Sequence, residues 1–343
     1  MKFRGMRVRA ECVSCLVERA KYECDIVFQS DLEKLRALKA FLRFLSANLS
    51  ESRTPSFYGT ERERLVKRLS GVRDPYRELK REANALAKTL LPVAEAFYRD
   101  AEDKTEALVR VAAVANAIEY GVKGYSFSTD AFKANFLSML RNEKLNWERE
   151  AVADAIEEHD AILYLTDNAG EVFFDAFVVR EFLKRGKFVV ISPKSEPVLN
   201  DATIEDLKDA LSFVGIPTAS TASTVPTAPT TSTASTVPTA PTSSTNLADA
   251  IEKSEEKTKA GAVSILPSGA YVGVSLEEAP ASFLSVLRDE RFLVVAKGMG
   301  HYEALSEIES AFKGRLLYIL KAKCEPVAES IGVKRGELVA KCI

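Results

Sequence analysis

Two kinds of apolar run alternate along the second half of the chain, and this alternation limits the possible fold more than any other feature of the sequence. Five runs are short and partly β-branched, as expected of buried parallel strands, and the runs between them carry apolar residues at helical spacing. Alternating strands and helices predict an α/β fold with a doubly wound, mostly parallel sheet. The expected strands are 161–166, 188–192, 262–266, 292–296 and 316–320, and the expected helices are 174–185, 204–210, 247–260, 280–287 and 302–312.

The first half of the chain has a different pattern, in which helical spacing recurs in four successive segments. Pro92 lies inside the third of them and is expected to kink or divide that helix, because proline has no N–H to donate. We therefore expect a helical domain over residues 1–158 and an α/β domain over residues 159–343. The four expected helices are 32–49, 61–69, 76–101 and 104–118.

A low-complexity segment interrupts the α/β pattern at about residues 217–246. Residues 219–230 recur with one change as residues 231–242, and neither copy has an aromatic or charged residue. Such a sequence cannot bury enough apolar surface to offset the entropy lost on ordering. We expect a disordered Thr/Ser/Ala/Pro insertion on the surface. A glycosylated stalk is the alternative, and the absence of a signal core in the sequence disfavours it.

The composition is that of a globular protein that does not bind polyanions. The 343 residues are 46% hydrophobic and carry a formal net charge of −2, which gives no electrostatic reason to expect nucleic acid or an anionic membrane as a partner. No apolar run reaches the length of a membrane span. We therefore expect a cytoplasmic protein, in which five cysteines are thiols or metal ligands rather than disulfides.

The segment Asp167-Asn168-Ala169-Gly170-Glu171 stands between the first expected strand and the helix that follows it. Ligands of open α/β sheets bind outside the carboxyl ends of the strands, so this segment is a candidate site. Asp167 and Asn168 offer oxygen donors suited to Mg²⁺ or Mn²⁺, and Gly170 would let a phosphate approach the helix N-terminus. The structural alternative is an ordinary Asx turn that starts a helix.

Polar residues also follow the other expected strands. Asp201 lies in the sequence Asn-Asp-Ala-Thr after the second strand, and Lys297, Gly298 and His301 follow the fourth. The residue preferences of ordinary turns explain the polar residues after any one strand. They explain the polar residues after all of these strands less well, because the ends of parallel strands converge on one edge of the sheet. The sequence therefore predicts a combined metal and phosphate site at that edge.

The expected chemistry of this site is phosphomonoester hydrolysis. Asp167, Asn168 and Asp201 would hold one divalent ion, with positions left for water and a phosphate oxygen. Lys297 would hold the phosphate as a point charge, and Gly298 would let backbone amides come close. Asp167, Asp201 and Lys297 are thus the expected catalytic residues. Whether Asp167 is itself attacked by phosphorus or only holds the ion stays open.

Other catalytic motifs are absent from the sequence. It has no P-loop, no dinucleotide fingerprint after a strand, no GxSxG and no HExxH. Its two histidines are His159 and His301. His301, in the glycine-rich loop, is a candidate general acid, ligand or substrate contact, although such a histidine is more often only a polar loop residue.

The cysteines form a second candidate site. Cys12 and Cys15 have the spacing of half a zinc site or a redox pair, and Cys324 could join them only through the fold. The alternative, which we favour slightly, is a helix start with buried thiols.

Taken together, these residues resemble the damage-control phosphatase family of metal-dependent phosphatases, over nearly the whole chain outside the insertion. The Cys-x-x-Cys is similar to that of the prokaryotic branch. The matching motifs are Cys12-x-x-Cys15, Asp74-Pro75-Tyr76 with Lys80 and Asn84, Asn116-x-x-Glu119, the Asp167–Glu171 segment with Asp175, Asn200-Asp201-Ala202-Thr203, Lys297-Gly298 with Glu303, and Lys323-Cys324-x-Pro326.

The resemblance implies a helical N-terminal domain over an α/β/α sandwich. It implies metal ligation by Asp167, Asn168 and Asp201, with Glu171 and Lys297 contacting substrate. It also implies hydrolysis of small phosphorylated metabolites, either sugar phosphates or damaged and excess cofactor-related phosphates, with Mn²⁺, Ni²⁺, Co²⁺ or Mg²⁺ as the ion.

Two further expectations follow from the family motifs. Asn116 falls in a motif close to the cleft, so a substrate contact is expected there as well. His301 replaces the asparagine usual in the Lys-Gly loop, and Glu119 replaces an aspartate, so substrate identity is the claim most affected. The alternative function is a non-catalytic protein that binds a phosphometabolite in the same pocket. The sequence does not predict the oligomeric state.

Overall fold

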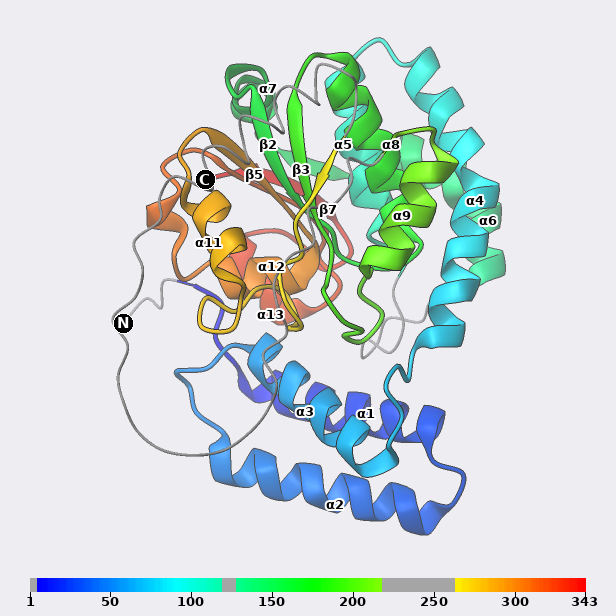
Figure 1. Cartoon of the computed structure of the whole chain (residues 1–343), viewed down its shortest axis with the longest axis vertical. Helices are drawn as coiled ribbons and strands as arrows, with labels where there is room; N and C mark the ends of the chain where they lie inside the picture. Colours follow the sequence, from blue (N-terminus) through cyan, green and yellow to red (C-terminus); the bar gives the residue numbers. More distant parts are fainter. Residues whose placement is uncertain (1–4, 119–127, 218–262) are drawn as a thin grey trace.

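The computed structural model describes residues 5–118, 128–217 and 263–343 (Figure 1). Within these ranges, one sheet of seven strands has the order β1-β7-β6-β5-β2-β3-β4. Neighbouring strands are parallel except for the pair β6 and β7. The strands are β1 (Leu145–Trp147), β2 (Ala161–Leu165), β3 (Phe188–Ser192), β4 (Ser264–Ile265), β5 (Phe292–Lys297), β6 (Leu316–Lys321) and β7 (Leu338–Cys342).

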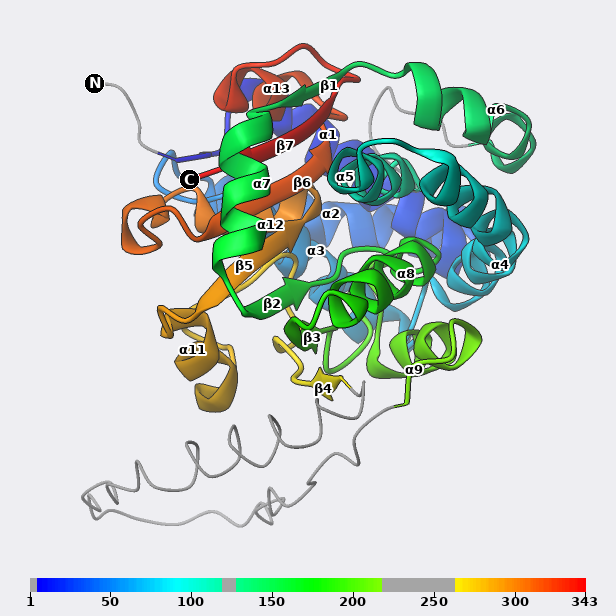
Figure 2. The ribbon, with the colours of Figure 1, turned by 90° about the horizontal axis from the view of Figure 1, so that it is seen from above.

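Helices cover both faces of this sheet (Figure 2). The N-terminal helices are α1 (Ala10–Val27), α2 (Asp31–Asn48), α3 (Pro55–Ser70), α4 (Arg77–Asp100), α5 (Lys104–Ala115), α6 (Thr129–Asn142) and α7 (Arg149–Glu158). The later helices are α8 (Glu171–Lys184), α9 (Ile204–Phe213), α11 (Ala281–Arg288), α12 (Gly298–Leu305), the 3₁₀ turn η1 (Glu309–Ala311) and α13 (Glu325–Ile331).

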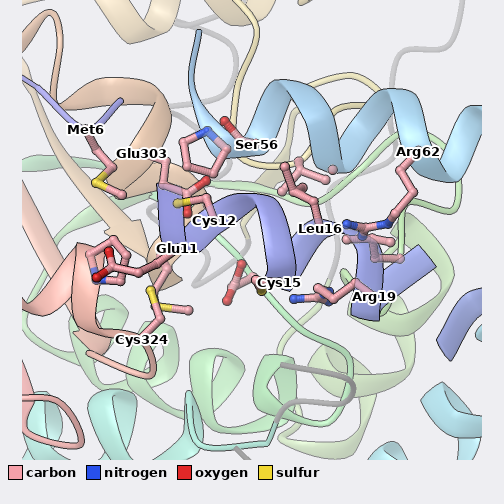
Figure 3. Close-up of a pocket in the computed structure, with 18 of the residues that line it drawn as sticks. Met6, Glu11, Cys12, Cys15, Leu16, Arg19, Ser56, Arg62, Glu303 and Cys324 are labelled. Atoms are coloured by element: carbon pink, nitrogen blue, oxygen red, sulfur yellow. The ribbon is translucent and has the colours of Figure 1, made fainter. Parts of the chain in front are cut away.

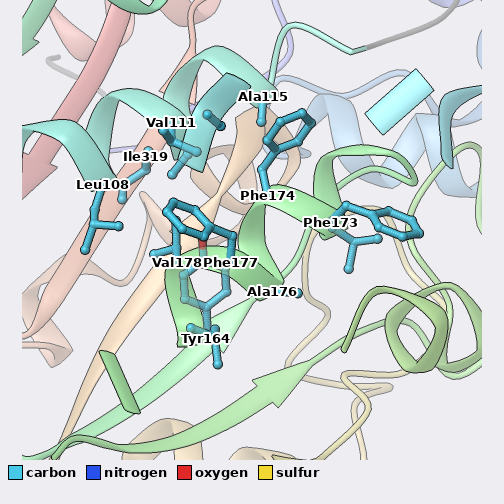
Figure 4. Close-up of a cluster of buried hydrophobic side chains, with 14 of the residues drawn as sticks. Leu108, Val111, Ala115, Tyr164, Phe173, Phe174, Ala176, Phe177, Val178 and Ile319 are labelled. Atoms are coloured by element: carbon cyan, nitrogen blue, oxygen red, sulfur yellow. The ribbon is translucent and has the colours of Figure 1, made fainter. Parts of the chain in front are cut away.

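The core lies on the two faces of the sheet, because successive side chains of a strand point to opposite sides. Ile162 and Tyr164 of β2 face one side, where they pack with side chains of α5 and α8 such as Phe177 (Figure 4). Leu163 and Leu165 face the other side, which α11, α12 and α13 cover. The predicted α/β/α fold with a mostly parallel sheet is confirmed.

Helices α1, α2 and α3 pack on one another through Leu16, Phe41 and Tyr58. They lie beyond the edge of the sheet at which β2 and β3 end, and α3 also packs against α12 (Figure 1). This arrangement puts helices opposite the loops that follow the strands. Among the residues that the structure describes, none of the helices combines the length and the hydrophobicity of a membrane span.

Several details differ from the sequence predictions. Strands β1 and β7 and helix α13 were not predicted, and α4 continues through Pro92 without dividing. The division at residue 158 stays a prediction. Strand β1 precedes it yet belongs to the sheet, and α4, α5 and α6 share the sheet's core. The expected helix 247–260, Glu119 and the insertion beyond Pro217 lie outside the described residues.

Candidate functional site

The loops that follow β2 and β3 meet at the carboxyl edge of the sheet. These strands are parallel neighbours in register, so their ends lie side by side. The backbone N–H of Ala202 donates to the carbonyl of Asp167 across 2.7 Å, and Asn168 and Asp201 form an isolated antiparallel bridge. The structure therefore brings together the three residues that the sequence grouped.

Asp167, Asn168 and Asp201 lie on the wall of one cavity of about 370 Å³. All three side chains are nearly buried, with 6%, 2% and 5% of their residue surfaces exposed. The opposite wall comes from the N-terminal helices (Figure 3). Helix α1 contributes Glu11, Cys12, Ser14, Cys15, Leu16 and Arg19, and α3 contributes Pro55, Ser56, Gly59 and Arg62.

A buried hydrogen-bond network lies behind Asp167. The Nδ2 atom of Asn116 donates to Oδ2 of Asp167 and to Oε2 of Glu171, both across 2.9 Å. The Nδ2 atom of Asn168 donates to the same two acids, across 2.8 and 2.9 Å. Asn116 and Glu171 are fully buried and are not among the residues that line the cavity. The structure therefore places them where they fix Asp167 and Asn168, not where a ligand in the cavity would touch them.

The sequence predicted that Lys297 faces Asp167 and Asp201 across the cavity, but the structure places this lysine elsewhere. Its ammonium group is fully buried, pairs with Glu171, and lies 3.0 Å from Oδ1 of Asp175. Burial alone would lower the pKa of Lys297, but the two carboxylates raise it above its ordinary value. Burial raises the pKa of Asp175 to about 6, against the opposing effect of Lys297. Lys297 thus neutralises acids behind the site.

Lys194, which sequence reasoning missed, is the lysine that lies beside the two loop acids. Its Nζ atom is 3.6 Å from Oδ2 of Asp201 and donates to the carbonyl of Gly273. Burial lowers the pKa of Lys194, and the nearby Asp201 and Asp167 oppose that shift. A signal was available in the sequence, because this lysine follows the strand β3 by two residues at the same edge of the sheet.

His301 lies on α12 behind the cavity wall and is fully buried. Its Nδ1 atom is 2.7 Å from the carbonyl of Lys297, and its Nε2 atom has no hydrogen-bond partner among the described residues. Burial, reinforced by the charge of Lys194, holds the pKa of His301 well below its usual range. The ring is therefore neutral at physiological pH.

Two glycines of the site have positive φ angles and accept close neighbours. A Cβ atom on Gly298, at φ 76°, would lie 1.9 Å from Oδ2 of Asp167. A Cβ atom on Gly170, also at φ 76°, would lie 2.8 Å from the carbonyl oxygen of Ala83 on α4. The backbone N–H of Gly170 donates to Asn84 of the same helix across 2.6 Å. The space at Gly170 is therefore taken by α4, not by a phosphate as the sequence suggested.

Several sulfur-containing side chains also line the cavity. Three of the five cysteines, Cys12, Cys15 and Cys324, line it together with Met6 and Met299 (Figure 3). Burial raises the pKa of Cys12 to about 11 and that of Cys324 to about 12, so both are protonated thiols at neutral pH. Within the described ranges, no group of three or more His, Cys, Asp or Glu side chains is arranged to hold a metal ion. A metal or redox role of these cysteines stays a prediction.

The residues at the loop ends fit a small, hard divalent ion. Two carboxylates and one amide oxygen are the donor types that Mg²⁺ and Mn²⁺ prefer. The Oδ1 atom of Asn168 accepts one hydrogen bond, from Nδ2 of Asn200 across 2.7 Å, and an amide oxygen has a second lone pair. The donor set is thus compatible with the ion that the sequence predicted.

The fold and the site define an α/β protein with a ligand cavity at the carboxyl edge of its sheet and with acidic oxygen donors on the cavity wall. More specifically, the chain belongs to the damage-control phosphatase ARMT1-like domain family, whose model matches residues 8–339. Membership of this family supports a phosphatase role.

Relatives from archaea match along almost the whole chain. An uncharacterized protein of Methanocaldococcus jannaschii is 30% identical over 99% of this chain and 97% of its own length. A damage-control phosphatase of Archaeoglobus fulgidus is 30% identical over 98% of this chain and its full length. The crystal structure of a DUF89-family protein from Pyrococcus horikoshii has a TM-score of 0.72 at 24% identity and covers 98% of this chain and 99% of its own. That structure supports the fold alone.

Proposed function

We propose that this protein is a divalent-metal-dependent phosphatase that acts on small phosphorylated metabolites. The observation that carries the proposal is the convergence of Asp167, Asn168 and Asp201, from two separate loops, on one cavity. A cavity of about 370 Å³ suits a small phosphate ester rather than a polymer.

Asp167, Asn168 and Asp201 are the proposed ligands of the ion, and Mn²⁺, Ni²⁺, Co²⁺ and Mg²⁺ are the candidate ions. When bound, such an ion polarises a phosphoryl oxygen and supplies water of lowered pKa. Lys194 lies on the same side of the site as these acids and balances part of their charge. Like Lys297, it is buried and does not line the cavity, so its role is to balance the charge of the acids and not to contact the substrate.

The residues behind the wall have a positioning role in this proposal. Asn116 holds the Asp167 carboxylate in one orientation, and Glu171 accepts from the amide of Asn168. Lys297 in turn neutralises Glu171. Side chains that are held in place in this way need little reorganisation when a ligand binds, which is where much of the catalytic advantage of such sites comes from.

The test is a screen of phosphate release over several divalent metals and a set of sugar phosphates, with p-nitrophenyl phosphate as the general substrate. We expect metal-dependent release that falls by more than about 100-fold in Asp167→Asn and in Asp201→Ala. Asp154→Asn, an exposed aspartate on α7, is the matched control. Near wild-type turnover in either site variant would refute the site.

The same screen separates this proposal from the non-catalytic alternative. A binding protein would show saturable binding of a phosphometabolite, measured by calorimetry, with no phosphate released under any metal. Nothing in the geometry of His301 favours that alternative, because the side chain is not on the cavity wall.

A further inference from the structure

The turn that delivers Asp201 to the cavity has a strained residue at its centre. The backbone N–H of Asp201 donates to the carbonyl of Val198 across 2.9 Å, which closes a four-residue turn. Leu199, the first central residue of this turn, has a φ of 47°. Turns with a positive φ at this position favour glycine, because a Cβ atom crowds the backbone there. A leucine holds this conformation only where its surroundings impose it.

Two side chains of helix α3 hold Leu199 in this conformation. Oε1 of Glu63 accepts from the backbone N–H of Leu199 across 2.7 Å. The ammonium group of Lys67 donates to the carbonyl of Pro197 across 2.5 Å and lies 3.0 Å from the same Glu63 oxygen. Glu63 is 2% exposed, so water does not compete for these contacts. The side chain of Leu199 is also buried, in a cluster with Tyr76.

The position of this turn sets the distance between the two proposed acidic ligands. Asn200, next to the strained residue, donates from Nδ2 to Oδ1 of Asn168 across 2.7 Å. Ala202, on the other side of Asp201, donates to the carbonyl of Asp167. A turn that relaxed toward an ordinary φ would therefore move Asp201 relative to both other ligands.

We propose that Glu63 is a positioning residue of the metal site, which holds Leu199 in its strained conformation and so places Asp201. Lys67 assists by fixing both Glu63 and the start of the turn. The same helix lines the cavity through Arg62, so α3 fixes a cavity wall and a metal-ligand loop together. This inference rests on the proposed function, because it assigns a role toward the ion that Asp201 would bind.

The experiment is a direct titration of the full-length protein with Mn²⁺, followed by electron paramagnetic resonance of the free ion, beside turnover of p-nitrophenyl phosphate as a function of Mn²⁺. Glu63→Ala should raise the Kd for Mn²⁺ by about 10-fold, the size expected for a lost hydrogen bond to a charged acceptor. Glu63→Gln should change it less, because the amide oxygen can still accept from Leu199. Glu61→Ala, on the same helix and paired with Arg64, is the matched control and should leave the Kd unchanged.

A second substitution tests the strain directly. Glycine adopts a φ of 47° without crowding, so Leu199→Gly in the Glu63→Ala background should recover part of the lost Mn²⁺ affinity. A merely structural role of Glu63 predicts the opposite, because this change also removes the buried leucine side chain. Failure to recover any affinity would overturn the inference.

Lys67→Met keeps the test decisive if Glu63→Ala does not fold. Lys67 is partly exposed, so the variant should fold, and its Kd for Mn²⁺ should rise by a few-fold as the turn loosens. An unchanged Kd in Lys67→Met would overturn the inference while the wild type still binds Mn²⁺ and releases phosphate. A wild type that neither binds Mn²⁺ nor releases phosphate would instead remove the proposed function, and this inference with it.

Discussion

The side-chain amide of Asn116 joins the end of helix α5 to the acid at the end of strand β2. Its Nδ2 atom lies 2.9 Å from Oδ2 of Asp167, and its Oδ1 atom accepts from the backbone N–H of Lys321 across 3.1 Å. Asn116 is the C-cap residue of α5 and is fully buried. One amide thus ties together a helix end, a neighbouring strand end and a proposed metal ligand.

Asn116→Leu should remove the donor for Asp167 and for Glu171 while keeping the volume. Because two buried acceptors and the backbone N–H of Lys321 then lose a partner, we expect a loss of about 1–3 kcal/mol in the free energy of unfolding and a clear fall in kcat. Urea denaturation and phosphatase assays measure both. Asn142→Leu, an exposed asparagine on α6, is the control, and equal effects of the two substitutions would argue against the role given to Asn116.

Gly298→Ala should disable the site through one methyl group. The added Cβ atom would lie 1.9 Å from Oδ2 of Asp167, so the carboxylate must move. Gly314→Ala is the matched control, because Gly314 has a φ of 87° and no atom within 4 Å of the added methyl group. Both variants should lose about 1 kcal/mol of stability from backbone strain, but only Gly298→Ala should lose metal-dependent activity.

Lys297→Met should leave Glu171 and Asp175 buried without their cation. Removing one partner of a buried ion pair costs about 3–5 kcal/mol, so we expect a large fall in the free energy of unfolding. A second change, Asp175→Asn, should restore part of that loss, since it removes one of the two uncompensated charges. Lys313→Met, which breaks an exposed pair with Glu290, should have little effect. Full stability of Lys297→Met would show that the buried pair is not needed.

The stability contributed by Asp175 should depend on pH. The pKa of its carboxyl group is raised to about 6 in the folded protein, mainly by burial, from an ordinary value of 3.8. A raised folded-state pKa gives stability that is fully present below the unfolded pKa and is lost as the pH rises through the folded pKa. Asp175→Asn should therefore gain stability relative to wild type between about pH 4 and pH 7 in urea denaturation. A difference that stayed constant over this range would contradict the shift.

The cavity thiols should react slowly. The pKa values of Cys12 and Cys324, raised by burial to about 11 and about 12, leave almost no thiolate at pH 8, and the thiolate is the reactive form. Alkylation by iodoacetamide, followed by mass spectrometry of peptides, should be far slower at these cysteines than for free cysteine in solution. Rapid modification of either residue at pH 8 would indicate an activated thiol and favour the redox interpretation.

The position of the acids could be predicted from the sequence because it depends only on strand order. Asp167 and Asp201 follow two apolar runs, and the ends of parallel neighbours must meet. Strands β1 and β7 were missed for the opposite reason. The first has three residues, and the second has three buried apolar residues followed by Lys341 and a half-buried Cys342, so neither produces a long apolar run.

The face of the sheet on which the Lys297 side chain lies could have been predicted from the sequence. Strand residues alternate between the two faces, so Lys297 shares a face with Leu293 and Val295 of β5. Those two side chains pack in the core that α8 covers, and α8 carries Glu171 and Asp175. Lys194 could also have been noticed from its place two residues after β3, but its distance from Asp201 depends on the path of the chain between them, which no local pattern specifies.

The cavity draws its walls from segments that lie far apart in the sequence, from Met6 on one side and from Arg335 on the other. Neither segment encloses the cavity without the other. The binding site is therefore expected to form only once the N-terminal helices and the segment around Arg335 have both packed on the sheet.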